Sequence, residues 1–326
     1  MRLGVVGGGA WGTALAQVAA AGGRETLLWA LEDEVVAGIN DHHANPVFLP
    51  GVPLDAAIRA TSDIGDLASC DAWLMVTPAQ HMRAVLERAE PGERPLVLCS
   101  KGIEEKSGAL LHHVARDAAP YSPVAVLSGP TFAHEVAAGL PTAVTLAAED
   151  LSLAERLRER IARPHFRVYV SDDVAGAEIG GAVKNVLAIA CGIVEGRGLG
   201  QNGRAALIAR GFAEMTRFGL ACGARRETLA GLSGLGDLVL TCSSTSSRNF
   251  SLGKGIGEGR SPDDLLSDRR TVAEGAFTAP VLARLARDLD IDMPIVQAVD
   301  SLLAGRASID TVLGEILSRP PRAEAI

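Results

Sequence analysis

A glycine-rich turn near the start of the chain constrains the possible fold more than any other stretch. The apolar run Leu3–Val6 leads directly into Gly7-Gly8-Gly9-Ala10-Trp11-Gly12, and apolar residues at helical spacing follow. This is the G-x-G-x-x-G pattern with a strand before it and a helix after it. The glycines permit a tight turn, bring helix close to strand, and let backbone N–H groups approach a pyrophosphate. The stretch therefore predicts the first turn of a dinucleotide-binding fold, with Gly7, Gly9 and Gly12 at the ligand.

Acidic residues follow a second predicted strand, Thr26–Trp29. Glu32 lies about 20 residues beyond the glycines, where such folds contact the adenosine ribose. A carboxylate there can bond the 2′-hydroxyl of NAD and would repel the 2′-phosphate of NADP. The same acids also suit the start of a helix over Glu34–Ile39, since carboxylates favour a helix N-terminus. Both interpretations stay open at this point.

Further apolar runs alternate with helical stretches up to residue 174. They lie at Trp73–Val76, Leu96–Cys99, Val124–Leu127, Ala143–Leu146 and Val168–Val170. This alternation predicts an α/β domain over 1–174, a Rossmann-type doubly wound parallel sheet. Ligands of such sheets bind beyond the carboxyl ends of the strands, which draws attention to Thr77-Pro78, Ser100-Lys101-Gly102 and Ser128–Ala133.

Beyond Val170 the strand pattern stops and helical patterns continue to the end. Ser171-Asp172-Asp173 is suited to capping a long helix that carries Lys184. Other predicted helices are Arg204–Arg217, Asp263–Leu266, Ala279–Leu289 and Pro294–Leu303. We expect an all-α second domain over 175–326, with a loose tail from Ser318. A length of 326 residues agrees with two domains.

Lys184 and Asn185 interrupt the apolar face of that long helix. An ammonium on an apolar helix is costly unless it is paired, so it either extends to solvent or lies in a cleft with partners. Lysine is rare in this chain, since Lys101, Lys106, Lys184 and Lys254 are the only ones. Lys101 follows a predicted strand, which makes it the second lysine of interest.

Two polar groups later in the chain are candidate partners. Asp237 and Thr241 are four residues apart and share a helix face, from which the carboxylate could pair with Lys184. The stretch Ser243–Asn249 offers hydroxyls, an amide and a guanidinium to a phosphate. A serine-rich stretch is also typical of a flexible linker, and the residues alone leave that alternative open.

Composition narrows the class of protein. The net charge of -8 argues against a nucleic-acid binder with a basic stripe. Five widely spaced cysteines indicate reduced thiols and a cytoplasmic location. No run approaches the roughly 18 apolar residues that a membrane span needs, and no His or Cys spacing suggests a metal site. We therefore expect a small-molecule substrate, with no nucleic acid, no membrane span and no metal.

The motifs together resemble the bacterial NAD(P)-dependent glycerol-3-phosphate dehydrogenase family. The resemblance runs through blocks that occur in family order over nearly the whole chain. These are Gly7–Ala16, Ser100-Lys101-Gly102, Gly129–Glu135, Ala182–Asn185, Gly234–Leu238, Ser247-Arg248-Asn249 and Val272–Gly275. It implies a Rossmann domain, a helical domain, a homodimer, and the reversible reduction of dihydroxyacetone phosphate to sn-glycerol 3-phosphate for phospholipid synthesis.

The resemblance also implies roles for single residues. Lys184 would be the catalytic acid/base, and the substrate contacts would be Lys101, Gly129, Thr131, Lys184, Asp237, Ser247, Arg248 and Asn249. The cofactor site would be lined by Ala10, Trp11, Lys101, Ala133, Arg248, Val272 and Glu274. Asn185 and Thr241 are candidates for orienting the catalytic pair, and Lys101 for supporting the developing alkoxide.

One departure from the family pattern concerns the cofactor, NAD or NADP. Many relatives carry an arginine after the second strand, whereas this chain has Leu31-Glu32, which favours NADH over NADPH. Two alternatives compete with this activity. One is another dehydrogenase with a helical domain, of the 3-hydroxyacid or 6-phosphogluconate type, and the other is a non-catalytic NAD-binding sensor. The Ser247-Arg248-Asn249 block is not expected in the first, and the set Lys101, Lys184 and Asp237 argues against the second.

Overall fold

The computed structural model describes residues 1–267 and 273–320 and divides the chain into two compact units. The first consists of Met1–Ser100 with Leu111–Val174, and the second of Lys101–Leu110 with the chain from Ala175 onward. The sequence-based division at 174/175 differs from this in one segment, since Lys101–Leu110 belongs to the second unit. The reason is packing: Ile103 is fully buried in the helical core around Ile179 and Val183.

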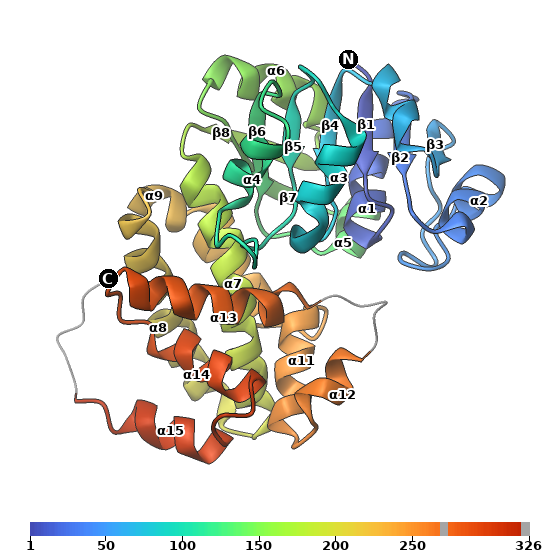
Figure 1. The fold of residues 1–326 in the computed structure, drawn as a ribbon. Coiled ribbons are helices and arrows are strands. Elements are labelled where there is room, and N and C mark those ends of the chain that lie inside the picture. The colour runs from blue at the N-terminus through green and yellow to red at the C-terminus, as the bar shows by residue number, and fades with distance from the viewer. Residues whose placement is uncertain (268–272, 321–326) are drawn as a thin grey trace. The chain divides into compact units, whose positions relative to one another are not determined.

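An eight-stranded sheet forms the centre of the first unit (Figure 1). The strands are β1 (Leu3–Val6), β2 (Thr26–Trp29), β3 (Ile58–Thr61), β4 (Ala72–Met75), β5 (Leu96–Leu98), β6 (Val124–Ser128), β7 (Thr142–Ala147) and β8 (Phe166–Ser171). Their spatial order is β3-β2-β1-β4-β5-β6-β7-β8. Strands β1, β2 and β4 are buried along their whole length, which explains their continuous apolar sequences.

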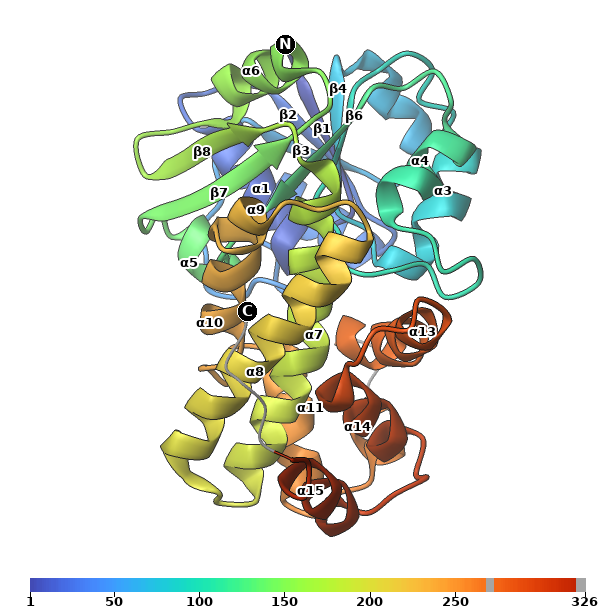
Figure 2. The ribbon, with the colours of Figure 1, turned by 90° about the vertical axis from the view of Figure 1, so that its left-hand side faces the viewer.

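Helices cover both faces of this sheet. They are α1 (Ala10–Ala20), α2 (Asp33–His42), α3 (Met82–Ala89), α4 (Leu111–Ala118), α5 (Ala133–Ala137) and α6 (Leu151–Ile161), with short 3₁₀ turns at Ile64–Ser69 and Ala79–His81. Helix α1 contacts α5 and α6 on one face, and α3 packs with α4 on the other (Figure 2). The predicted doubly wound α/β class is therefore confirmed.

Two details of the sheet differ from the sequence-based expectation. Strand β3 was not predicted, because it is an edge strand in which Arg59 is exposed between buried Ile58 and Ala60, so no continuous apolar run marks it. The expectation of a wholly parallel sheet is wrong for one pair, since β7 runs antiparallel to β6. A buried apolar run carries no information about strand direction, so the sequence pattern could not reveal this.

The second unit is helical, as predicted. Its helices are α7 (Val174–Gly196), α8 (Gly200–Ala221), α9 (Arg226–Leu229), α10 (Asp237–Thr241), α11 (Arg248–Gly257), α12 (Pro262–Leu266), α13 (Glu274–Asp288), α14 (Pro294–Leu303) and α15 (Ile309–Leu317). A π-helical turn, Leu232–Gly236, precedes α10. Helix α7 is long and apolar enough to cross a membrane by length and composition, and its most apolar window is entirely buried inside the structure. Burial of this kind is found in the core helix of a globular protein.

Glycines bring α7 and α11 into backbone contact. A Cβ built on Gly253 would lie 1.9 Å from the carbonyl oxygen of Ile189, and one on Gly192 would lie 2.0 Å from that of Phe250. No side chain fits at these distances, so the two helices approach as closely as their backbones allow. The contact holds the first turn of α11 beside Asn185, where Asn249 reaches it.

Candidate active site

The glycine turn of the first unit has the form that a dinucleotide requires. Gly7 has φ +124°, and a Cβ on Gly12 would lie 1.9 Å from the Gly7 carbonyl oxygen, so the fold itself demands both glycines. A Cβ on Gly9 would meet nothing within 4 Å. Gly9 is the N-cap of α1, and the N–H groups of the following turn lack acceptors within the helix. Gly9 is thus not required by packing, and the free N–H groups at this helix end are suited to binding an anion.

A buried polar cluster that sequence reasoning missed supports this turn. The Asn45 amide donates to the Gly8 carbonyl at 2.8 Å and to the Thr13 hydroxyl at 2.8 Å. Asn45 and Thr13 are both fully buried. No motif marks Asn45, which lies in the loop after α2 and approaches the turn only through the folding of the chain.

The other cofactor candidates of the first unit lie at the starts of helices. Ala10 and Trp11 begin α1, and Ala133 begins α5. The Trp11 indole N–H is buried without an acceptor among the described residues, as expected of a group that meets a ligand. Glu32 is the exposed N-cap of α2 and makes no side-chain capping bond, while Asp33 begins the helix. The helix-start interpretation thus fits Asp33, and the Glu32 carboxylate is not used by the helix.

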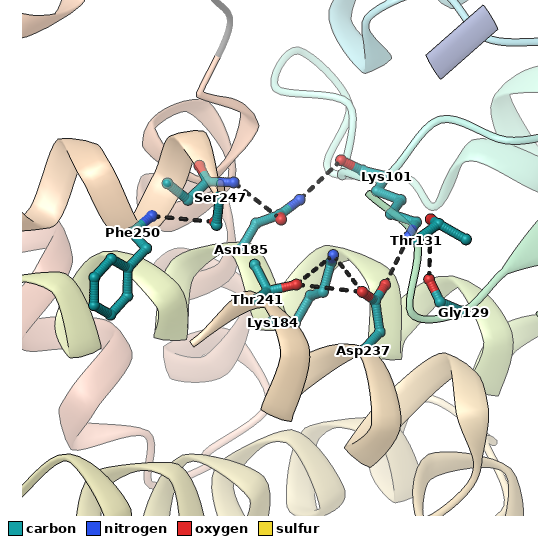
Figure 3. Close-up of polar contacts among 10 residues, drawn as sticks. Lys101, Gly129, Thr131, Lys184, Asn185, Asp237, Thr241, Ser247 and Phe250 are labelled. Carbon is teal, nitrogen blue, oxygen red and sulfur yellow. Dashed lines mark hydrogen bonds and ion pairs between the residues drawn. The ribbon is translucent and has the colours of Figure 1, made fainter. Parts of the chain in front are cut away.

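Lys184 is buried on α7 and is paired. Its Nζ donates to Asp237 Oδ1 at 2.7 Å and to the Thr241 hydroxyl at 2.8 Å (Figure 3). Only 7% of the Lys184 side chain is exposed, which excludes extension of the ammonium to solvent. The Lys184 ammonium is therefore held by polar partners inside the helical unit.

Asp237 forms ion pairs with both candidate lysines, Lys184 and Lys101. The second carboxylate oxygen of this fully buried aspartate accepts from Lys101 Nζ at 2.6 Å. Two ammonium groups thus share one carboxylate, which leaves the cluster with a net positive charge suited to an oxyanion. The π-helical turn positions Asp237 by close approach to α7, since a Cβ on Gly180 would lie 2.4 Å from the Ser233 carbonyl oxygen.

The pKa of Lys184 is lowered to about 8. Burial is the largest cause; the Asp237 carboxylate opposes it by raising the pKa, and the nearby Lys101 ammonium lowers it further. The sequence left open which effect would prevail, and the structure shows that burial does. An amine with this pKa exchanges a proton near neutral pH.

An amide pair lies beside this cluster. The Asn249 amide donates to Asn185 Oδ1 at 3.0 Å, and the Asn185 amide donates to the Lys101 carbonyl at 3.5 Å. The Ser247 hydroxyl caps α11 by accepting from the Phe250 N–H at 3.2 Å. Arg248 is exposed in the first turn of α11 and interacts electrostatically with Glu274. The linker interpretation of Ser243–Asn249 is therefore wrong for its last residues, which begin a helix.

Hydrogen bonds within the second unit thus join six of the predicted site residues. Ser247 and Arg248 directly precede one of them, Asn249, in the sequence. Those six are Lys101, Lys184, Asn185, Asp237, Thr241 and Asn249. Gly129 and Thr131 lie in the first unit, where the Thr131 hydroxyl donates to the Gly129 carbonyl at 3.2 Å. Their roles and those of the cofactor residues stay predictions, and Val272 lies outside the described residues. Within 1–267 and 273–320 no group of three or more potential metal ligands occurs.

Comparison with known proteins covers both units. The family model for the NAD-dependent glycerol-3-phosphate dehydrogenase N-terminus matches residues 2–154, and that for the C-terminus matches residues 173–314. Glycerol-3-phosphate dehydrogenase [NAD(P)+] of Erythrobacter litoralis is 64% identical over 323 residues, covering 99% of this chain and 98% of its own length. The counterpart numbered 1 from Sphingopyxis alaskensis is 62% identical with the same coverage. The crystal structure of glycerol-3-phosphate dehydrogenase from Coxiella burnetii has a TM-score of 0.93 at 38% identity, covering 98% of this chain and 99% of that one.

Proposed function

Because this chain belongs to the NAD-dependent glycerol-3-phosphate dehydrogenase family, we propose that it reduces dihydroxyacetone phosphate reversibly to sn-glycerol 3-phosphate with Lys184 as proton donor. The role of Lys184 is supported by its ion pair with Asp237, which also pairs with Lys101. Each of these charges is costly to bury alone, so a buried cluster of this kind indicates a functional site.

The reaction needs a proton donor and positive charge at one oxygen. A bound nicotinamide cofactor supplies the hydride, and addition of hydride to the ketone carbon leaves negative charge on its oxygen. Lys184 Nζ donates the proton to that oxygen and becomes a neutral amine, still held by Thr241. Lys101 keeps a second positive charge beside Asp237, which stabilises the developing alkoxide. In the oxidative direction the neutral Lys184 amine accepts the proton from the alcohol.

The phosphate of the substrate is assigned to the start of α11. Arg248 offers a guanidinium, Asn249 an amide, and the helix N-terminus favours an anion. Ser247 supports this site by capping the same helix. Gly129 and Thr131 are the further substrate contacts that the family resemblance implies. The cofactor residues are those named from the sequence: Gly7, Gly9, Ala10, Trp11, Gly12, Glu32, Lys101, Ala133, Arg248, Val272 and Glu274.

A direct assay tests this function. Purified protein is mixed with NADH and dihydroxyacetone phosphate, and oxidation of NADH is followed by absorbance. We expect turnover with this substrate and none with 6-phosphogluconate plus NAD or with a 3-hydroxyacid plus NAD. Turnover of one of those compounds alone would support the other dehydrogenase class, and cofactor binding without any turnover would support a sensor.

The pH dependence of the two directions should be opposite. Reduction uses the Lys184 ammonium, so its kcat/KM is expected to be constant below pH 8 and to fall about tenfold per pH unit above it. Oxidation uses the neutral amine, so its kcat/KM should rise up to about the Lys184 pKa of 8 and then level off. Initial rates from pH 6 to 10 check this. Asp237→Asn removes the group that raises this pKa, so both breaks should move to lower pH; unchanged breaks would contradict the assignment.

The cofactor preference rests on Glu32. Its exposed carboxylate follows β2 and should repel a 2′-phosphate, so we expect kcat/KM for NADH to exceed that for NADPH. Glu32→Arg should reverse the order, while the neighbouring exposed Glu34→Gln serves as control and should leave it unchanged. A wild-type kcat/KM for NADPH at or above that for NADH would disprove the preference.

The cellular setting follows from the product and the composition. sn-Glycerol 3-phosphate is the backbone that glycerophospholipid synthesis requires, and the five free cysteines suit the reducing cytoplasm. The chain is assigned to a homodimer, as the family resemblance implies. Sedimentation equilibrium on the purified protein measures this directly, and a mass of one chain at micromolar concentration would reject the dimer.

A further inference from the structure

A directed chain of hydrogen bonds links the start of α13 to the loop that carries Lys101. The Gly275 N–H donates to Asn249 Oδ1 at 2.9 Å, the Asn249 amide donates to Asn185 Oδ1 at 3.0 Å, and the Asn185 amide donates to the Lys101 carbonyl at 3.5 Å. Asn185 and Asn249 are 5% and 7% exposed. All four residues belong to the second unit.

The two ends of this chain determine the orientation of both amides. A backbone N–H can only donate, so the Asn249 atom that faces Gly275 must be oxygen. Its nitrogen then faces Asn185, whose facing atom must also be oxygen. The Asn185 nitrogen meets the Lys101 carbonyl, which can only accept. The Gly275 donor at one end and the Lys101 acceptor at the other thus require the same orientation of the two amides. Neither amide can flip without losing hydrogen bonds.

From this we infer that Gly275 is a positioning residue, which holds Asn249 and through it Asn185 so that each presents a free N–H donor to the substrate. An amide nitrogen has two hydrogens, and the chain uses one hydrogen of each asparagine. Among the described residues no acceptor takes the second hydrogen of either amide. This remaining donor suits the oxygen atoms of a phosphate or ketone and disfavours a cationic ligand. The inference rests on the proposed function and names how that site orients its amides.

Glycine is required at this position for a steric reason. A Cβ on Gly275 would lie 2.6 Å from the Asn185 carbonyl oxygen and 2.8 Å from Asn249 Oδ1. The first neighbour is backbone of the buried helix α7, which cannot move aside as a side-chain tip can. A methyl group therefore has to push the start of α13 away, and the Gly275 N–H then leaves Asn249 Oδ1. Without that donor the Asn249 amide is free to flip.

A double-mutant cycle tests the inference, with wild-type turnover of dihydroxyacetone phosphate measured first. We expect Gly275→Ala to raise the KM for dihydroxyacetone phosphate about tenfold, the loss of one oriented hydrogen bond to a charged group. Asn249→Ala should raise it at least as much. In the Asn249→Ala background, adding Gly275→Ala should change KM less than about twofold, since Gly275 then has no amide to orient. Gly314→Ala in α15, where a Cβ meets nothing within 4 Å, is the matched control and should leave KM unchanged.

The outcomes separate the inference from the proposed function. Equal increases in KM in both backgrounds, or no increase for Gly275→Ala, would overturn the positioning role. Absence of wild-type turnover would overturn the proposed function and this inference together. If Gly275→Ala does not fold, as judged by circular dichroism, Asn185→Leu replaces it in the cycle. The expected result is then a KM increase that is smaller in the Asn249→Ala background than in the wild-type background, because Asn185 keeps its own donor but is no longer held by Asn249. Equal increases in the two backgrounds refute the chain.

Discussion

Replacing Lys184 with alanine is expected to lower kcat for reduction of dihydroxyacetone phosphate at least about 10²-fold, the usual size of a general acid contribution. The variant loses the proton donor, while Lys101 still pairs with the buried Asp237 carboxylate, so the helical unit should remain folded. Affinity for NADH should be unchanged, because the dinucleotide turn lies in the other unit. Steady-state kinetics and fluorescence titration with NADH measure the two quantities.

Lys106→Ala is the matched control for this experiment. Lys106 is one of the few other lysines, is exposed, and lies in the same Lys101–Leu110 segment as Lys101. Its removal should leave kcat within twofold of wild type, since exposed side chains away from a site contribute little. Turnover of Lys184→Ala within about tenfold of wild type would show that another group donates the proton.

Substitution of Gly253 by alanine is expected to lower the free energy of unfolding by roughly 3 kcal/mol, the upper part of the range for overpacking a core. The added methyl group would lie 1.9 Å from the Ile189 carbonyl oxygen, so α7 and α11 must separate. Separation moves the first turn of α11 away from Asn185, and the KM for dihydroxyacetone phosphate should rise together with the loss of stability. Urea denaturation followed by circular dichroism measures the first effect.

Gly314→Ala in α15 again provides the comparison, because the methyl group there enters open space. In an exposed helix alanine is preferred to glycine by about 1 kcal/mol, so this variant should be as stable as wild type or more stable. If Gly253→Ala and Gly314→Ala have the same free energy of unfolding, the close contact of α7 and α11 does not contribute to stability as described.

Local patterns in the sequence were enough for most of the architecture. Residue type and spacing were enough to predict the glycine turn and most of the buried strands. The reason is that φ constraints and burial leave a pattern in residues that are neighbours in the sequence. Pro294–Leu303 was predicted to the residue, since a proline at the first helical position and an apolar period mark it. Strand β3 and the reversed direction of β7 were not accessible, because edge position and strand direction depend on which strands pair.

The supporting parts of the site were harder to predict than its charged residues. A lysine on an apolar helix and an aspartate on a helix face attract notice wherever they occur. Asn45 does not, and Gly275 does so only as the last residue of the Val272–Gly275 block, since an asparagine in a loop and a glycine at a helix start are common for many reasons. Their roles follow from close approach to Gly8 and to Asn249, which lie far from them in the sequence.

Lys184 shows most clearly what the sequence determines and what the tertiary structure determines. The sequence by itself determined that an ammonium lies on an apolar helix face and that the chain has only three other lysines. Only the tertiary structure decided that Asp237 serves Lys184 and Lys101 at once, and that burial outweighs this attraction to bring the lysine pKa to about 8. The physical reason is that desolvation and charge pairing sum over everything packed around a group, and these neighbours come from distant parts of the chain.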